Sequence, residues 1–178
     1  MDCQSCWSWC FASWAGLPGC QDVAVDISAR TEYAVRAVLM LGRAQADGRD
    51  PMSADELAGE QELPRKFLEA ILADLRRGGV VASQRGAAGG YRLARPAADI
   101  AIGSIFRAVD GPLAEVRGLR PGETTYAGVA EHLPTLWVAV RASLREVLDE
   151  VSVADLLAGD FPSPVRRLLA IPDAWDNR

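Results

Sequence analysis

Cysteine is absent from the chain after residue 20, and this absence limits the chemistry of the main fold. All four cysteines fall in the first 20 of 178 residues (Cys3, Cys6, Cys10 and Cys20). Disulfide bonds therefore cannot stabilise the later residues, and a metal cluster there would lack thiolate ligands. The chain also has no apolar run near the ~20 residues that cross a bilayer. No Lys or Arg precedes Arg30, so the basic start of a signal peptide is missing. We expect a soluble cytoplasmic protein without a membrane partner.

Positive charge is in the minority, but it is concentrated in one stretch. The formal net charge is −5, and Lys66 is the only lysine. Residues 65–95 nevertheless carry seven cations against Glu69 and Asp74, a net +5 (Arg65, Lys66, Arg76, Arg77, Arg85, Arg92 and Arg95). Because DNA phosphates respond most strongly to the nearest surface, this local patch is compatible with DNA binding by an acidic protein.

Helical spacing and capping signals predict the elements from residue 26 onward. Ser28 is a candidate N-cap for a helix to about residue 46, and Ser53 with Glu56 forms a capping box. The further predicted elements are a helix at 64–77, strands at 80–82 and 91–93, and helices at 102–109, 134–150 and 152–158. We divide the chain into an extension (1–25), a winged-helix DNA-binding domain (26–112), a loop (113–133), a dimerisation helix region (134–158) and a tail without obvious period (159–178).

The order of these elements is that of a winged helix-turn-helix: mainly α, with a small β-hairpin wing and a long C-terminal dimerisation helix. A helix fits the major groove, so the helix from Pro64, with an apolar stripe that includes Phe67, is the candidate recognition helix. A glycine-rich wing lets the backbone approach DNA closely and places Arg85 for the minor groove. The candidate DNA-binding residues are Arg65, Lys66, Phe67, Glu69, Arg85, Gly86, Gly89, Gly90 and Tyr91.

The long helix at 134–150 has a wide apolar face that a protein of this size cannot cover alone. That face predicts a symmetric homodimer, which would match a two-fold DNA site. The candidate dimerisation residues are Leu136, Trp137, Val140, Leu144, Val147 and Leu148.

Four segments together resemble the Rrf2 family of bacterial transcription regulators. They are ISARTEYAVRA at 27–37, LRRGGVV at 75–81, RGAAGGY at 85–91 and VDGP at 109–112. The resemblance covers residues 26–158 and implies a homodimeric regulator of palindromic promoter sites, more often a repressor than an activator. It implies recognition residues at Lys66, Phe67 and Glu69 and a minor-groove arginine at Arg85. A position that is often Gln in the family is Ala70 here.

The chain departs from the cluster-binding members of that family. Those members place three cysteines before the dimerisation helix, whereas residues 101–150 have none and Glu131 occupies the last position. We therefore expect no iron–sulfur cluster and no other cofactor or metal. His132 is expected to be a surface residue, and Glu32 to pair with Arg36 one helical turn away.

Three alternatives stay open at this stage. The winged helix could be a protein-interaction module without DNA binding, although such a module has no need for Arg65, Lys66 and Arg85 together. The controlling signal could be a small molecule bound between the dimerisation helix and the 113–133 loop. It could also be redox state or metal sensed by the N-terminal cysteines, although we expect translation to begin near Val25 or Val23. No arrangement of a nucleophile and a base, and no cofactor motif, predicts an enzyme.

Overall fold

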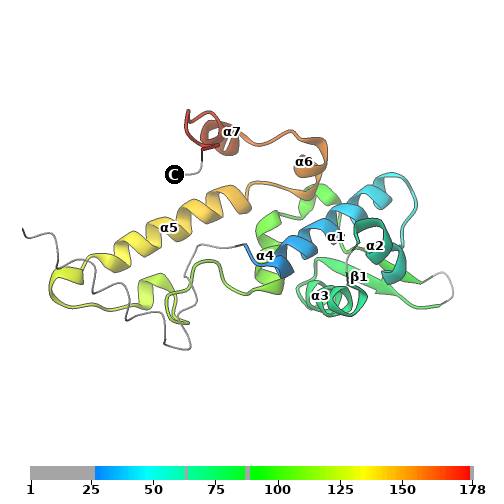
Figure 1. The fold of residues 1–178 in the computed structure, drawn as a ribbon, viewed down its shortest axis with the longest axis horizontal. Coiled ribbons are helices and arrows are strands. Elements are labelled where there is room, and N and C mark those ends of the chain that lie inside the picture. The colour runs from blue at the N-terminus through cyan, green and yellow to red at the C-terminus, as the bar shows by residue number, and fades with distance from the viewer. Residues whose placement is uncertain (1–26, 63, 87–88, 177–178) are drawn as a thin grey trace, which may run out of the picture.

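The computed structural model describes residues 27–62, 64–86 and 89–176, which form a mainly helical body with one β-hairpin (Figure 1). The helices and strands are α1 (Ala29–Ala46), α2 (Ala54–Gln61), α3 (Arg65–Arg77), β1 (Val81–Gln84), β2 (Gly90–Leu93), α4 (Ile102–Val109), α5 (Leu133–Leu148), α6 (Val153–Ala158) and α7 (Ser163–Leu169). Short 3-10 turns lie at η1 (Ala97–Asp99), η2 (Pro121–Glu123) and η3 (Gly128–Ala130). This architecture confirms the predicted fold class.

Helix α1 lies at the centre of the hydrophobic core. Its residues Ala34, Val38 and Leu41 are completely buried, and α3, α4, α6 and β2 all pack against this helix. Each fully buried Val or Leu side chain stabilises the fold by roughly 1.5–3 kcal/mol. The helix begins where the sequence predicts, because the Ser28 side chain accepts a hydrogen bond from the backbone N–H of Thr31 (3.0 Å).

Capping boxes begin α2 and α6. In α2 the backbone N–H of Ser53 donates to the Glu56 carboxylate (2.7 Å), and the N–H of Glu56 donates to the Ser53 hydroxyl (3.2 Å). The bond from the Ser53 backbone, aided by its hydroxyl, favours the charged carboxylate and lowers the pKa of Glu56. Ser152 and Asp155 repeat this arrangement in α6, where the Ser152 hydroxyl lowers the pKa of Asp155.

The wing is an antiparallel hairpin anchored in the core at its base. Val81 pairs with Leu93 at the buried end, and Gln84 pairs with Gly90 near the tip. The backbone of Met52 adds a bridge to β2, since Met52 N donates to Tyr91 O (2.9 Å) and Tyr91 N donates to Met52 O (2.7 Å). The strands begin and end within about two residues of their predicted bounds.

Helix α5 extends away from the body (Figure 1). None of its residues is buried within the described chain. Val147 and Leu148, at its C-terminal end, pack against the hydrophobic core, whereas Leu136 and Val140 remain 52% and 39% exposed. Of the six predicted dimerisation residues, Val147 and Leu148 therefore contribute to the chain's own fold.

The tail contains a helix that the sequence analysis did not predict. Helix α7 packs against α5, and its residue Val165 is buried. Arg167 adds an ion pair to Glu146 of α5 (3.5 Å). Two turns of helix are too short to show a clear hydrophobic period, and the neighbouring prolines favoured an irregular interpretation.

Candidate nucleic-acid interface

Helix α3 presents one apolar face to the core and one polar face to solvent. The helix begins at Arg65, one residue later than predicted, and Pro64 is its N-cap rather than its first helical residue. The buried apolar residues are Leu68, Ile71, Leu72 and Leu75. The exposed residues of its first two turns include Arg65, Lys66 and Glu69. The polar face therefore begins at the end of the helix that would meet base edges in a major groove.

Phe67 is not part of the buried stripe, which corrects the sequence-based assignment. Its side chain is 41% exposed, and its ring meets the Tyr33 ring edge to face, with centroids 5.8 Å apart. Tyr33 of α1 packs against the ring, and much of the Phe67 side chain stays at the surface. An apolar side chain in this place can contact a thymine methyl group.

The guanidinium of Arg65 is already paired with two carboxylates. It lies 2.7 Å from Asp55 of α2 and 3.2 Å from Glu69, one helical turn along α3. All three side chains are more than half exposed. The pair with Glu69 joins two residues that the sequence nominated as separate DNA contacts.

Asp74 is the charged residue of α3 that turns inward. It is 7% exposed, and its carboxylate forms ion pairs with Arg30 of α1 and Arg77 of α3. A buried carboxylate needs such partners, because desolvation otherwise disfavours its charge. The link to Arg30 fastens the start of α1 to α3.

Four cations of the basic stretch have neither a carboxylate nor a hydroxyl partner within the described part of the chain. They are exposed and are carried by α3, the wing and the segment after β2 (Lys66, Arg85, Arg92 and Arg95). Arg76 instead donates to the Ser83 hydroxyl (3.4 Å), which joins the end of α3 to β1. Helix α3 and the wing thus form one connected surface, and the cations on it that lack an ion-pair partner make it positively charged.

Arg92 was not among the predicted DNA contacts, although the strand pattern of the wing indicates that it faces outward. Side chains alternate between the two faces of a strand, and Leu93 next to it is buried. Arg92 must therefore face outward from the wing, as the structure shows.

The wing glycines have a clear structural reason to be glycine. A Cβ on Gly90 would lie 2.3 Å from Met52 O, and a Cβ on Gly89 would lie 2.4 Å from Gln84 O. Gly86 has a φ of +114°, which other residues rarely adopt. These glycines shape the wing, and the tip residues 87–88 lie outside the described residues. Tyr91 is half-buried, with its backbone bonded to Met52.

A family model described as "Rrf2: Iron-dependent Transcriptional regulator" matches residues 27–159. The chain belongs to the Rrf2 family. Its sequence is 44% identical over 142 residues to a candidate HTH-type transcriptional regulator of Mycobacterium tuberculosis, covering 80% of this chain and 87% of that protein. It is 32% identical to the HTH-type transcriptional regulator CymR of Bacillus subtilis, covering 74% of this chain and 89% of the relative.

Solved structures of Rrf2 proteins agree with this membership. The structure of CymR, the global cysteine regulator of B. subtilis, superposes with a TM-score of 0.64 at 29% identity, covering 76% of this chain and 98% of CymR. T. potens IscR gives a TM-score of 0.60 at 34% identity, covering 76% and 88%. The chain is thus a DNA-binding transcription regulator of the helix-turn-helix type and not an enzyme.

The part of the chain that the structure describes contains no cysteine. Cluster irons are held mainly by cysteine thiolates, and this chain has no cysteine after Cys20. Among the described residues, no three His, Cys, Asp or Glu side chains gather as metal ligands. His132 lies at the surface, 3.3 Å from Glu131. The N-terminal cysteines and the expected start near Val25 lie outside the described residues.

Glu32 pairs with Arg36 at 3.3 Å, which confirms the predicted contact along α1. No helix in the described ranges has the length and apolar character needed to cross a membrane.

Proposed function

We propose that this Rrf2 protein binds a palindromic operator as a homodimer and represses transcription. Each protomer inserts α3 into a major groove, with Lys66, Phe67 and Glu69 near the bases. The wing places Arg85 against the adjacent minor groove, where narrow A·T-rich segments attract arginine. Arg92 and Arg95 contact phosphates.

One observation carries this proposal: the free positive charge lies on the two elements that face DNA in a winged helix. Lys66 and Arg85 have no carboxylate partner among the described residues. The residues outside 65–95 sum to −10, because the whole chain carries −5 and that stretch +5. A basic surface of this kind on an otherwise acidic protein is suited to bind a polyanion there.

The dimer is supported by the exposed apolar residues of α5. Leu136 and Val140 lie one helical turn apart and are 52% and 39% exposed. Trp137 and Leu144 are half-buried beside them. A second α5 packed along this face would bury these side chains, at roughly 25 cal/mol per Å² of apolar surface.

The two-fold symmetry of such a dimer sets the form of the operator. Two copies of α3 related by the dimer axis meet half-sites about one helical turn apart, roughly 10 base pairs or a multiple of it. A dimer across a promoter covers DNA that RNA polymerase needs, which favours repression. We further propose that the protein works without an iron–sulfur cluster, since the cysteines of the cluster-binding members are missing after Cys20.

Selection of bound sequences from random DNA duplexes tests the proposal. The full chain should enrich an inverted repeat, and the apparent affinity should fall steeply as salt rises. The same repeat placed in a promoter should lower transcription in vitro when the protein is added. Absent or salt-insensitive binding would favour the protein-interaction module instead, and enrichment of a single half-site would contradict the dimer.

A further inference from the structure

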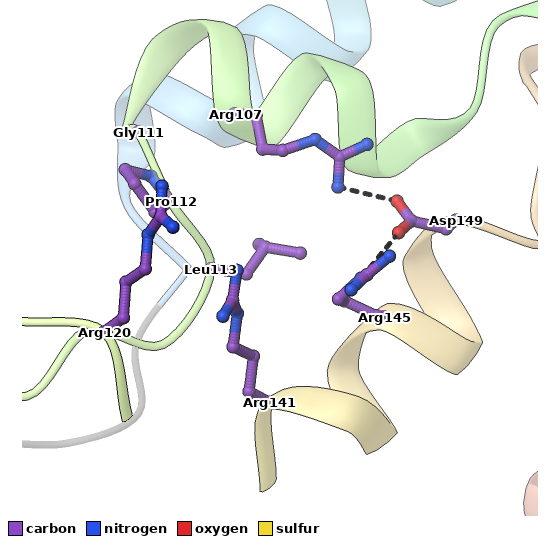
Figure 2. Close-up of a pocket in the computed structure, with 8 residues that line it drawn as sticks. All are labelled: Arg107, Gly111, Pro112, Leu113, Arg120, Arg141, Arg145 and Asp149. Atoms are coloured by element: carbon purple, nitrogen blue, oxygen red, sulfur yellow. Dashed lines mark hydrogen bonds and ion pairs between the residues drawn. The ribbon is translucent and has the colours of Figure 1, made fainter. Parts of the chain in front are cut away.

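A cavity of about 460 Å³ lies where the end of α4, the loop after it and helix α5 meet. Its polar lining is almost entirely arginine, with guanidinium groups contributed by three separate segments (Figure 2). The lining residues are Arg107, Gly111, Pro112, Leu113, Arg120, Arg141, Arg145 and Asp149. This volume is within the range of sites that hold small molecules, about 300–1,000 Å³.

Two of the four arginines are paired with one shared carboxylate. Asp149 accepts from Arg107 at 2.7 Å and from Arg145 at 3.2 Å, so α4 and α5 are joined through this residue. The pair forms one side of the cavity (Figure 2). One carboxylate cannot balance two guanidinium groups, so this side alone keeps a positive charge.

The other two arginines have no carboxylate partner among the described residues. Arg120 reaches in from the loop and Arg141 from α5, both toward the segment from Gly111 to Leu113 (Figure 2). The Arg141 Nε atom is shielded from solvent and has no hydrogen-bond partner. A shielded donor without an acceptor destabilises the fold, and an acceptor placed in the cavity would remove that cost.

We propose that this cavity binds a small metabolite with at least two anionic groups, phosphate or carboxylate. The four arginines and Asp149 give the cavity a net charge of +3. Guanidinium groups bind both kinds of anion through paired hydrogen bonds, with a geometry that planar carboxylates and phosphates share. Pro112 and Leu113 supply apolar surface for the carbon part of such a molecule.

The cavity lies between the DNA-binding domain and the proposed dimer helix, so a bound anion can regulate DNA binding. This regulatory role rests on the proposed function. Helix α4 packs against α1 and α3 of the DNA-binding domain, while α5 carries the proposed dimer face. An anion held by Arg120 and Arg141 together would fix the loop to α5, whose C-terminal end is already joined to α4 through Asp149 and Arg107. The separation of the two recognition helices in the dimer, and hence operator affinity, would then depend on the anion.

Calorimetric titration of the full chain with inorganic pyrophosphate and with citrate tests the site, with sodium chloride holding ionic strength constant. At least one probe should bind with a Kd below about 1 mM. Arg120→Gln and Arg141→Gln should each weaken that binding about tenfold, as expected for loss of a charge-assisted pair. Arg166→Gln on α7, an exposed arginine paired with Asp160, is the matched control. The probe that binds identifies the anion as phosphate or carboxylate.

Several results would overturn the site. They are no binding of either probe to the wild type, equal weakening in Arg166→Gln, or unchanged binding in the folded Arg120→Gln and Arg141→Gln variants. Weaker operator binding by these variants without any anion would show instead that the arginines contact DNA. Dissociation of the dimer by these substitutions would show that they contact the partner.

Operator binding separates the regulatory role from the proposed function. Affinity for the selected duplex, measured with and without the bound probe, should change by about fivefold or more in the wild type, within the usual range of allosteric coupling. It should not change in Arg141→Gln. Operator binding that ignores a bound anion would overturn the regulatory role, while leaving DNA binding by α3 and the wing intact.

Discussion

The Arg65 guanidinium lies 2.7 Å from the Asp55 carboxylate, which joins the first turn of α3 to the first turn of α2. Both side chains are exposed, 59% and 66%, so the pair contributes little to stability, about 0–1 kcal/mol. Its larger effect concerns DNA. A phosphate approaching α3 must compete with Asp55 for Arg65 and must also come close to the Asp55 charge.

Asp55→Asn should therefore tighten DNA binding. We expect the affinity for duplex DNA to rise about three- to tenfold at low salt, with a smaller gain at high salt, because screening weakens the lost repulsion. Asp47→Asn is the matched control, since Asp47 is another exposed aspartate paired with two arginines, Arg43 and Arg49. Fluorescence anisotropy across a salt series measures both. Equal affinities for the two variants would contradict this role of Asp55.

Gly90→Ala should destabilise the wing. The added Cβ would lie 2.3 Å from Met52 O, so β2 or the backbone at Met52 must shift and weaken their bridge. We expect a loss of about 1–3 kcal/mol in the free energy of unfolding, as for other overpacked sites. Gly59→Ala in α2 is the control, because nothing lies within 4 Å of its added Cβ. Alanine there should stabilise by about 0.5–1 kcal/mol. Urea denaturation gives both values, and an unaffected Gly90→Ala would contradict the packing described here.

The capping box of α2 should make stability depend on pH in the acid range. Hydrogen bonds from Ser53 lower the pKa of Glu56 from its ordinary value of 4.5. A carboxylate with a lowered pKa stabilises the fold above its unfolded pKa, and this stabilisation is lost as pH falls through the folded pKa. We expect the Glu56 contribution to be constant above about pH 5 and to decline below about pH 4.5.

Urea denaturation between neutral pH and the acid range checks this expectation. Glu56→Gln should show a shallower fall in stability with acid than the wild type, because the amide does not titrate. Glu60→Gln, in the same helix, is the matched control. An identical acid slope in wild type and Glu56→Gln would show that the capping box does not contribute in this way.

A charge on the exposed face of α5 should break the proposed dimer. Val140→Asp places a carboxylate on a side chain that is 39% exposed in the single chain and would be covered by the partner helix. Burial of an unpaired charge costs several kcal/mol, so the dimer should dissociate at micromolar concentration. Ala142→Asp, at an exposed position of the same helix, should stay dimeric. Sedimentation equilibrium distinguishes the two, and a dimeric Val140→Asp would place the interface elsewhere.

The sequence predicted those parts of the fold that local signals determine. Ser28 and Ser53 marked helix starts correctly because capping is a short-range effect. Helix α7 was missed because it is short and begins among prolines. Phe67 was assigned to the core from its spacing, but only the position of Tyr33 on α1 determines that its ring stays partly exposed. Tertiary neighbours decide such cases, and no local pattern encodes them.

The same distinction applies to the candidate sites. The basic stretch was visible in the sequence, but the pairing of Arg65 with Asp55 and the inward turn of Asp74 required the packing of α2, α1 and α3. A small-molecule site between the dimerisation helix and the 113–133 loop was left open from the sequence, but its arginine lining was not predicted, because residues from Arg107 to Asp149 meet only through the return of α5 to α4.

The central claim, that α3 and the wing bind DNA together, is tested most directly by Arg85→Ala on the selected operator. Affinity measured across a salt series should fall about tenfold or more, and the salt slope should decrease by about one counterion. Arg166→Ala on α7 should bind as the wild type does, and both variants should unfold as it does. Wild-type affinity and salt slope in Arg85→Ala, or an equal loss in Arg166→Ala, would contradict the account.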